Sequence, residues 1–558
     1  MLNAKNTRSM AIRAPSTSCL PSPLHRGRRP SVLLFKFPRP TPSYSIADVA
    51  TTAGIRRISC VDPNTNEQSP VARRSANYMP SVWDYDILKS LSVDFAEERC
   101  TEPVQRMKEE VKDTLERENH LLAKLELIDA IQRLGLQYHF ENDIKRALQV
   151  IHDDSNDACF SNDLHSTALR FRLLRQHGYD LSQDAFQRFI NKTGTFEESL
   201  KKDVKGLLGL YEASFHGLEG ENILDEAQDF ASKHLKNLNL NEIPTCLAKQ
   251  VLHALDMPIR WRPNRLEARW FMDMYGKQQD MIPSLLRLAK LDFNLVQTIH
   301  RKEVSNLARW WVELGANNMT FSRDRLVENY FWSCLMVFEP QYTAYREMTT
   351  KIGCMVTLID DVYDVYGTLE ELVLLTDFIV RAYIKEVHWY NEGIKPTLKE
   401  YMSNAVDSIG GLIMLLHSYF LTTDNLTKEG LDYMSKIPRI MHCSAKILRL
   451  NDDLGTSSYE LARGDNFKAL ECYMNETGAS TEAAQQHIKH LVRETWKTMN
   501  KDVFEDYPFP GFKPFLGACL NLARASQCFY QYGDGHGLPG HETRDHIVST
   551  LFKPVPLD

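Results

Sequence analysis

The sequence lacks several features that would mark common classes of protein. Its 11 cysteines are odd in number, widely scattered and never spaced as CxxC, which argues against a disulfide framework and a structural zinc site. No apolar run approaches the roughly 18 residues that cross a bilayer, so we expect no membrane span. The formal net charge is −7 and no long basic stripe occurs, so we also expect no nucleic-acid partner.

Acidic residues are scarce only at the start of the chain. Residues 1–72 hold ten Lys and Arg against three acids, whereas the remaining 486 residues carry 56 against 70. The same segment contains nine serines and nine of the 24 prolines. An Arg- and Ser-rich segment with few acids is typical of an organellar transit peptide, and a disordered tail is the alternative. We therefore predict a transit peptide over residues 1–72.

Runs of alternating apolar and polar residues, which predict strands, are missing as well. Apolar residues instead recur at three- and four-residue steps in residues 122–136, 196–210, 285–307 and 488–499. This pattern predicts helices, and no fixed-period repeat suggests a solenoid. We expect an all-α protein with two domains after the transit peptide, over residues 73–290 and 291–558.

A first group of carboxylates follows the apolar stretch 352–359. Asp360, Asp361 and Asp364, called here the first oxygen stripe, lie within two helical turns, and Asp360 and Asp364 share one helix face. Such carboxylates repel one another unless a cation lies between them. Oxygen ligands with an incomplete shell suit Mg²⁺, which keeps waters and binds phosphate oxygens. Taken alone, this group also fits a solvated acidic helix face.

A second group makes the metal interpretation stronger. Asp452, Thr456 and Glu460, called here the second oxygen stripe, lie four residues apart, along about 12 Å of one helix face. Two such stripes on separate helices can hold a diphosphate between metal ions. Cations that can bind the same anion flank the stripes, although each also fits a surface salt bridge. These cationic residues are Arg323, Arg325, Arg449 and Lys468.

Four ordered motifs carry a resemblance to a known family. They are RRSANYMPSVW at 73–83, RDR at 323–325, DDVYD at 360–364 and NDDLGTSSYELARGD at 451–465. With these motifs the chain resembles the plant terpene synthases and, among them, the plastidial monoterpene synthases. The resemblance runs from Arg73 nearly to the C-terminus. It implies a two-domain terpene synthase fold, in which an N-terminal helical domain precedes a C-terminal class I bundle with the active site.

The resemblance also implies a role for the two stripes and the cationic residues. Both stripes would be metal-binding motifs that hold three Mg²⁺ or Mn²⁺ ions around a prenyl diphosphate, with Asp360 and Asp364 as direct ligands. Asp361 belongs to the same motif and is a predicted catalytic residue. Arg323 and Arg325 would also be catalytic, and the four cations would gather the diphosphate as the allylic C–O bond ionises. The protein would then be a carbon–oxygen lyase that acts on geranyl diphosphate in the plastid.

Aromatic residues are candidates for the wall around the resulting carbocation. Trp332 and Tyr345 lie between the RDR and DDVYD motifs, and aromatic faces stabilise a desolvated cation by roughly 1 to 2 kcal/mol. Core packing is the alternative for both. Tyr530, a predicted catalytic residue, and Asp534 resemble a segment that caps the mouth of the site. By the same resemblance, Arg73 and Arg74, which otherwise read as the basic end of the transit peptide, would close the N-terminal segment over the substrate.

One departure from the family pattern stands out. Only 90 residues separate Asp361 from Asn451, whereas the family pattern leads us to expect roughly 50 more, or about two to three helices with their connections. The residues that resemble the family pattern continue up to Arg381. From Ala382 onward they correspond to a later part of that pattern, so the stretch usually found between is absent. Loss of whole helices would expose apolar surface, and each Å² of lost burial costs about 25 cal/mol of folding free energy. Because the net stability of a protein is only about 5 to 15 kcal/mol, this loss could be decisive.

Two further hypotheses therefore stand beside an active monoterpene synthase. The first is an impaired or inactive variant, from a spliced transcript or an imperfect gene model, that keeps both metal motifs but does not close its cavity. The second is a sesquiterpene synthase that uses farnesyl diphosphate. Because sustained heptads are missing, we expect a monomer.

Overall fold

A computed structural model describes the chain from residue 76 onward, with interruptions. The described residues are 76–91, 97–153, 163–367, 369, 372, 381–423, 427–465, 467–505, 509 and 512–557. The predicted transit peptide, Arg73 and Arg74 lie outside these residues. Within them no strand forms, apart from an isolated bridge between Ile190 and Phe196, so the predicted all-α fold is confirmed.

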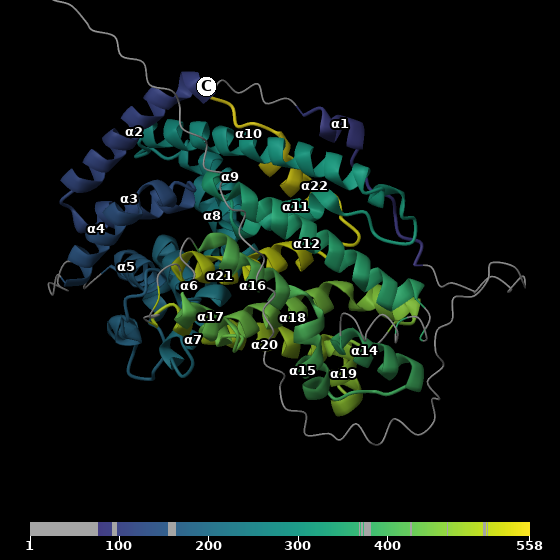
Figure 1. The fold of residues 1–558 in the computed structure, drawn as a ribbon. Coiled ribbons are helices and arrows are strands. Elements are labelled where there is room, and N and C mark those ends of the chain that lie inside the picture. The colour runs from purple at the N-terminus through teal and green to yellow at the C-terminus, as the bar shows by residue number, and fades with distance from the viewer. Residues whose placement is uncertain are drawn as a thin grey trace, which may run out of the picture. The chain divides into compact units, whose positions relative to one another are not determined.

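Helices follow one another along the whole described chain (Figure 1). The first group is α1 (Tyr85–Lys89), α2 (Glu97–Arg117), α3 (Leu121–Arg133), α4 (Glu141–Asp153), α5 (Leu164–Gln176), α6 (Val204–Ser214), α7 (Asn222–Lys236), α8 (Thr245–Asp256) and α9 (Asn264–Tyr275). Short 3₁₀ helices join several of them, including η7 (Ile259–Trp261).

The later helices include those that carry the sequence motifs. They are α10 (Pro283–Glu313), α11 (Leu326–Met336), α12 (Thr343–Asp361), α14 (Arg381–Glu392), α15 (Leu398–Ser408), α16 (Gly411–Thr422), α17 (Lys428–Met434), α18 (Arg439–Arg463), α19 (Ala469–Thr477), α20 (Thr481–Asp502), α21 (Phe512–Tyr530) and α22 (His541–Ile547). Two π-helical turns, η10 (Val362–Tyr366) and η11 (Val548–Phe552), extend α12 and α22.

Side-chain caps explain where several helices begin. Asp163 accepts a hydrogen bond from the Ser166 backbone at 2.9 Å, and Thr397 with Glu400 forms a capping box before α15. The helix predicted over 196–210 forms only from Val204, because Asp203 caps α6 by accepting from the Gly206 backbone at 2.8 Å. A 3₁₀ helix occupies the residues before that cap.

The buried apolar residues fall into separate clusters. One is built mainly from residues between Val104 and Phe293 and also includes Val555, and the largest is built mainly from residues between Val304 and Leu551 and also includes Leu88. Helix α10 contributes to both clusters, and the predicted boundary between residues 290 and 291 falls inside this helix. The division into 73–290 and 291–558 therefore stays a prediction.

The motif helices pack around the C-terminal cluster. Helix α18 contacts α20 and α21, and α12 contacts α11 and α16 (Figure 1). Beyond the shortened connection, α14 packs on η10, where the rings of Tyr363 and Tyr383 lie 5.3 Å apart. The chain thus brings a residue from just after Arg381 against the end of the first oxygen stripe.

One described stretch is apolar and long enough to cross a membrane by length and composition alone. It spans Leu398–Thr422, and an 18-residue window within it has a mean hydropathy of 1.3 and is half buried within the protein. The left-handed backbone of Gly410, at φ +77°, separates the stretch into α15 and α16. A half-buried, interrupted stretch is weak support for a span, and the absence of one stays a prediction.

Candidate active site

Side chains of both oxygen stripes, all except Asp361, line one cavity of about 300 Å³. Asp360 at the end of α12 and Asp364 in η10 line it from one side, and Asp452, Thr456 and Glu460 line it from α18. A single π-helical turn between the first two carboxylates is a feature that often marks functional sites. The structure therefore contains the two stripes on separate helices, as the sequence predicts.

Asp361 lies outside this cavity. It is 0% exposed, and its carboxylate accepts from Ser322 Oγ at 2.8 Å and from the Arg323 backbone at 2.6 Å. Arg323 Nε donates to the other oxygen at 2.8 Å. With these donors on both oxygens, Asp361 orients Arg323 toward the cavity.

Three cationic side chains line the cavity beside the stripes. Arg323 Nη2 lies 2.5 Å from Asp360, and Arg449 Nη2 contacts Asp452. Lys468 Nζ lies 3.7 Å from Glu460 Oε1, on the same side as the second oxygen stripe. These carboxylates and cations neutralise one another within a single lining.

Carboxylates nevertheless outnumber cations in this lining. Asp534 joins the four carboxylates of the stripes, which gives five against three. Burial raises the pKa of Asp452 to about 7, against the opposing effect of Arg449. Burial and the neighbouring Asp360 likewise raise the pKa of Asp364. The surplus negative charge would be relieved by cations that enter from solvent.

Aromatic and apolar side chains form the rest of the lining. Trp332 stacks on Phe529 with ring centroids 4.3 Å apart, and Tyr530 lies 6.0 Å from the same indole. The apolar residues are Val356, Ile409, Met414, Leu448 and Leu538. The lining therefore combines charged side chains with aromatic and apolar ones, as a substrate with a diphosphate and a hydrocarbon tail requires.

Two residues predicted for the site lie elsewhere. Arg325 does not line the cavity, because its Nη2 donates to the carbonyls of Gly537 at 2.8 Å and Met79 at 3.2 Å. It ties the segment before α1 to the loop after α21. Tyr345 is fully buried in the core, where its hydroxyl lies 3.1 Å from Ser418 Oγ.

Other lining residues have no counterpart in the sequence-based prediction. Tyr78, Asn329, Tyr383, Tyr459 and His536 all line the cavity. Tyr78 and Tyr459 lie inside the motifs at 73–83 and 451–465, so these two motifs gave a signal. Tyr383 gave none, because its position depends on the shortened connection before α14.

The residue set fits divalent metal ions that are shared with a bound anion. Within the described ranges, no three His, Cys, Asp or Glu side chains converge on one point. The donors are instead oxygens spread over two helices, where each ion would draw further ligands from water and diphosphate. In this structure Arg323, Arg449 and Lys468 form ion pairs with three of these carboxylates.

An all-helical fold around two oxygen-bearing helices defines the class of metal-dependent isoprenoid enzymes. The family description "Terpene synthase, N-terminal domain" matches residues 82–255. The description "Terpene synthase family, metal binding domain" matches 312–381 and again 379–498. The chain belongs to the terpene synthase family, and the predicted enzyme class, a lyase that acts on prenyl diphosphates, is confirmed. The second match breaks at residues 379–381, where the sequence departs from the family pattern.

Individual relatives cover nearly the whole chain. A chloroplastic myrcene synthase from Quercus ilex is 44% identical over 90% of this chain and 93% of its own. A beta-bisabolene synthase from Santalum austrocaledonicum is 42% identical over 92% of this chain and 99% of its own. Relatives that make monoterpenes and sesquiterpenes are thus about equally similar to this protein.

Two solved structures share the fold. Limonene synthase with 2-fluorolinalyl diphosphate has a TM-score of 0.83 at 38% identity, over 87% of this chain and 100% of that one. Isoprene synthase from Populus x canescens, with three Mg²⁺ ions and dimethylallyl-S-thiolodiphosphate, has a TM-score of 0.78 at 38% identity, over 85% and 99%. The predicted two-domain terpene synthase fold and the divalent metal cofactor are confirmed.

Proposed function

We propose that the protein is a monoterpene synthase that converts geranyl diphosphate to a C10 terpene and releases diphosphate. One observation carries this proposal. A single cavity combines side chains of both oxygen stripes and three cations with Trp332, Tyr530 and aliphatic side chains. Its volume of about 300 Å³ is at the lower end for ligand pockets and favours the shorter of the two prenyl substrates.

In this proposal the stripes hold the metal ions and the cations hold the diphosphate. Asp360, Asp364, Asp452, Thr456 and Glu460 supply the oxygens. Bound ions would stabilise the negative charge that develops on the leaving diphosphate. Asp361 acts as a positioning residue, because it contacts Arg323 and does not line the cavity.

The cationic side chains would exchange one set of partners for another. Arg323, Arg449 and Lys468 now contact carboxylates of the stripes. When metal ions take those carboxylates, the guanidinium and ammonium groups become available to diphosphate oxygens. The same exchange would bring both stripes toward the anion, without a change in either helix.

The apolar part of the cavity would protect the carbocation. Trp332 presents a large aromatic face and is buried by Phe529 behind it. The segment before α1 and the loop after α21 both line the cavity, and Arg325 joins them. Together they exclude water, which would otherwise quench the cation. By the same logic, Arg73 and Arg74 would extend this cover.

The substrate is tested by direct competition. The full chain would receive geranyl diphosphate, farnesyl diphosphate or both with Mg²⁺, and the products would be separated by gas chromatography. We expect C10 products to dominate and to vanish in Asp364→Asn and in EDTA. A preference for farnesyl diphosphate would favour the sesquiterpene synthase, which the bisabolene synthase relative also suggests.

An impaired variant is the second candidate, and the broken family match at residues 379–381 is the observation that favours it. Thermal unfolding with and without Mg²⁺ and inorganic diphosphate separates the two. A sharp transition that rises with the ligands supports an enzyme with a formed site. A broad transition that ligands do not move, together with no product, supports the impaired variant.

We also propose that residues 1–72 direct the protein to the plastid, where it acts as a monomer. The composition of the segment and the chloroplastic myrcene synthase relative support this localisation. A fluorescent fusion of the full chain should enter plastids, and a fusion without residues 1–72 should not. Plastid import of both would contradict the transit peptide.

A further inference from the structure

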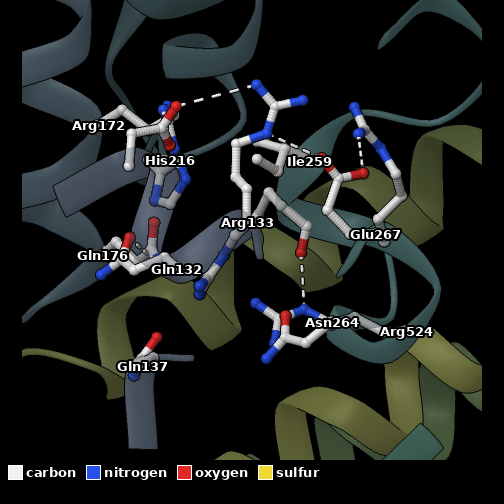
Figure 2. A pocket seen from close by; sticks show the side chains of 13 residues that line it. Gln132, Arg133, Gln137, Arg172, Gln176, His216, Ile259, Asn264, Glu267 and Arg524 are labelled. Atoms are coloured by element: carbon white, nitrogen blue, oxygen red, sulfur yellow. Dashed lines mark hydrogen bonds and ion pairs between the residues drawn. The ribbon is translucent and has the colours of Figure 1, made fainter. Parts of the chain in front are cut away.

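A second, smaller pocket of about 40 Å³ lies among buried charges (Figure 2). It shares no lining residue with the active-site cavity. Helix α3, helix α5 and η7 border it on the N-terminal side of the chain, and α21 borders it from the C-terminal side. Apart from Ile259, every residue that lines it has a polar or charged side chain.

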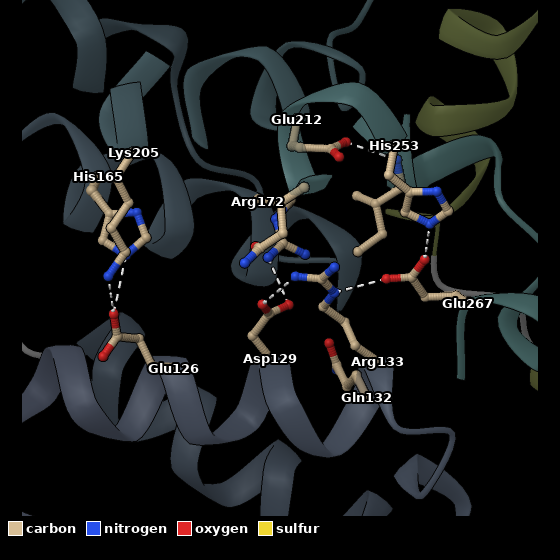
Figure 3. Close-up of polar contacts among 12 residues, drawn as sticks. Glu126, Asp129, Gln132, Arg133, His165, Arg172, Lys205, Glu212, His253 and Glu267 are labelled. Carbon is tan, nitrogen blue, oxygen red and sulfur yellow. Dashed lines mark hydrogen bonds and ion pairs between the residues drawn. The ribbon is translucent and has the colours of Figure 1, made fainter. Parts of the chain in front are cut away.

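Three of the arginines at this pocket are paired with carboxylates (Figure 3). The pairs are Arg172 with Asp129 at 2.7 Å, Arg133 with Glu267 at 2.8 Å and Arg262 with Glu212 at 3.0 Å. A carboxylate oxygen of Glu267 also lies 2.9 Å from Nε2 of His253. The pKa of Glu267 is well below its usual range, because the charges of Arg262 and Arg133 outweigh the effect of burial. These pairs balance one another in charge.

Two further guanidiniums line the pocket without a carboxylate. Arg260 in η7 is 4% exposed and Arg524 in α21 is 9% exposed. Arg260 Nε donates to Asn500 at 3.0 Å, and Arg524 donates to Asn521 at 2.7 Å and to the Arg260 carbonyl at 2.9 Å. Across the part of the chain that the structure describes, no acidic side chain forms an ion pair with either. The pocket therefore holds an excess of two positive charges.

Such an excess is costly inside a protein. Burying a charge without a partner of opposite sign costs several kcal/mol, and a structure normally pairs it or binds a counter-ion. Burial and Arg524 lower the pKa of Arg260 to about 9, and burial lowers the pKa of Arg524 to about 10. Burial and Arg260 also hold the pKa of His216, at the same pocket, well below its usual range. Neighbouring arginines thus act on Arg260 and His216, whereas burial alone accounts for the shift at Arg524.

We propose that this pocket binds a small inorganic anion that bridges the guanidiniums of Arg260 and Arg524. A water needs about 10 to 15 Å³ by this measure of volume, so the pocket accepts about three water-sized groups. That is enough for a chloride ion with water or for a compact oxyanion. Free guanidinium N–H groups would supply charge-assisted hydrogen bonds to either one.

The anion would join two distant parts of the chain. Arg260 precedes α9, and Arg524 lies on α21, six residues before Tyr530 at the active-site cavity. Besides the Arg524 bond to the Arg260 carbonyl, Asn500 of α20 links Arg260 to the carbonyls of Phe215 and Gly217. A bound anion would thus strengthen a contact that supports α21 from behind.

Thermal unfolding of the full chain tests the proposal. The protein would be melted without divalent ions in potassium gluconate, chloride or phosphate at equal ionic strength. We expect chloride or phosphate to raise the Tm by about 3 to 6 °C at a hundredfold excess over its Kd. The Lys468→Gln variant should keep this rise, which separates the pocket from phosphate binding at the active site. Equal Tm values in all three salts would overturn the proposal.

Matched variants assign the effect to the two arginines. Arg260→Gln and Arg524→Gln should lose most of the anion-dependent rise, whatever their starting Tm. Arg439→Gln removes a charge that is already paired with Asp502 and Glu505 and should keep the rise. An equal rise in all variants would overturn the proposal. If the variants do not fold, a wild-type crystal in bromide decides, by an anomalous peak between Arg260 and Arg524 or by water alone.

Discussion

The hydroxyl of Tyr85 donates a hydrogen bond of 2.5 Å to Oδ1 of Asp324. The indole of Trp311 donates to the same oxygen at 3.0 Å, and Trp83 donates to Glu328 at 2.9 Å. The segment around α1 is thus attached to α10 and to the RDR motif at its central residue. Because Arg323 and Arg325 flank that residue, the cover of the site and its diphosphate-binding arginines share one support.

We predict that Tyr85→Phe loosens this segment while the rest of the fold stays intact. A hydrogen bond to a charged group contributes about 1.5 to 3 kcal/mol, and here it holds a short helix. Amide hydrogen exchange in residues 76–91 should accelerate at least tenfold, and product formation should fall. Tyr532→Phe, which removes a bond to Asp256, is the control and should leave that exchange unchanged.

We predict opposite outcomes for two neighbouring aspartates. Asp364→Asn removes a cavity carboxylate and should reduce turnover at least a hundredfold with little change in Tm. Asp361→Asn breaks a buried contact with Arg323 and should lower stability by about 3 to 5 kcal/mol as well as turnover. Urea unfolding and product assays on both variants check this. Equal stability of the two variants would contradict the assignment of Asp361 as a positioning residue.

We predict that Mg²⁺ and inorganic diphosphate stabilise the protein together more than either does alone. The excess of carboxylates attracts the metal, and the metal frees the cationic side chains for the anion. Differential scanning fluorimetry should show a Tm rise of several degrees that EDTA reverses. Glu460→Gln should remove most of the joint effect, whereas a purely additive response would argue against a shared site.

We predict that stability falls as the pH decreases from about 6.5 toward 4. Burial, with Lys513 nearby, lowers the pKa of His177 to about 4, so the unfolded chain binds a proton before the folded protein does. The contribution is complete above the unfolded pKa and is lost through this window. Urea unfolding of His177→Gln should show a slope smaller by up to about 1.4 kcal/mol per pH unit. An unchanged slope would mean that His177 is protonated in the fold.

We predict that the apolar surface of α16 lowers solubility. Ile413 is 45% exposed and Phe420 is 39% exposed on a helix that has no Asp, Glu, Lys or Arg. The double variant Ile413→Gln and Phe420→Gln should remain soluble at higher concentration with a Tm within a few degrees of the wild type. Light scattering against concentration checks this, and unchanged scattering would show that another surface drives association.

Periodicity predicted the long helices well, because their apolar stripes are packing faces. Helix α3 covers most of the predicted 122–136, and α10 and α20 extend beyond the predicted 285–307 and 488–499. The start of α6 depends instead on a single side chain, Asp203, which an apolar pattern does not register. The predicted domain boundary near residue 290 falls inside α10, and the apolar pattern gave no sign that this helix contributes to the clusters on both sides of it.

Residue spacing also predicted which residues of α18 share a helix face. It did not predict which of the neighbouring arginines would line the cavity. Whether a motif arginine points into the cavity depends on contacts with distant segments. Arg323 points inward because Asp361 holds it, whereas Arg325 is occupied by the carbonyls of Met79 and Gly537. Tyr383 lines the cavity because α14 packs on η10. These two elements are close in sequence because a stretch of the family pattern is missing between them.

The continuity of α18 sets what kinds of insertion or deletion the gene can survive. A helix turns by about 100° per residue, so one codon gained between Asp452 and Glu460 would rotate the glutamate out of the cavity. A change of about 7, 11 or 18 codons, each close to a whole number of turns, would restore the phase. The interruption at Arg381 lies at the first residue of α14, outside α12 and α18, the helices that carry the stripes. A large loss of sequence there leaves both stripes in register, which accounts for the survival of complete motifs beside it.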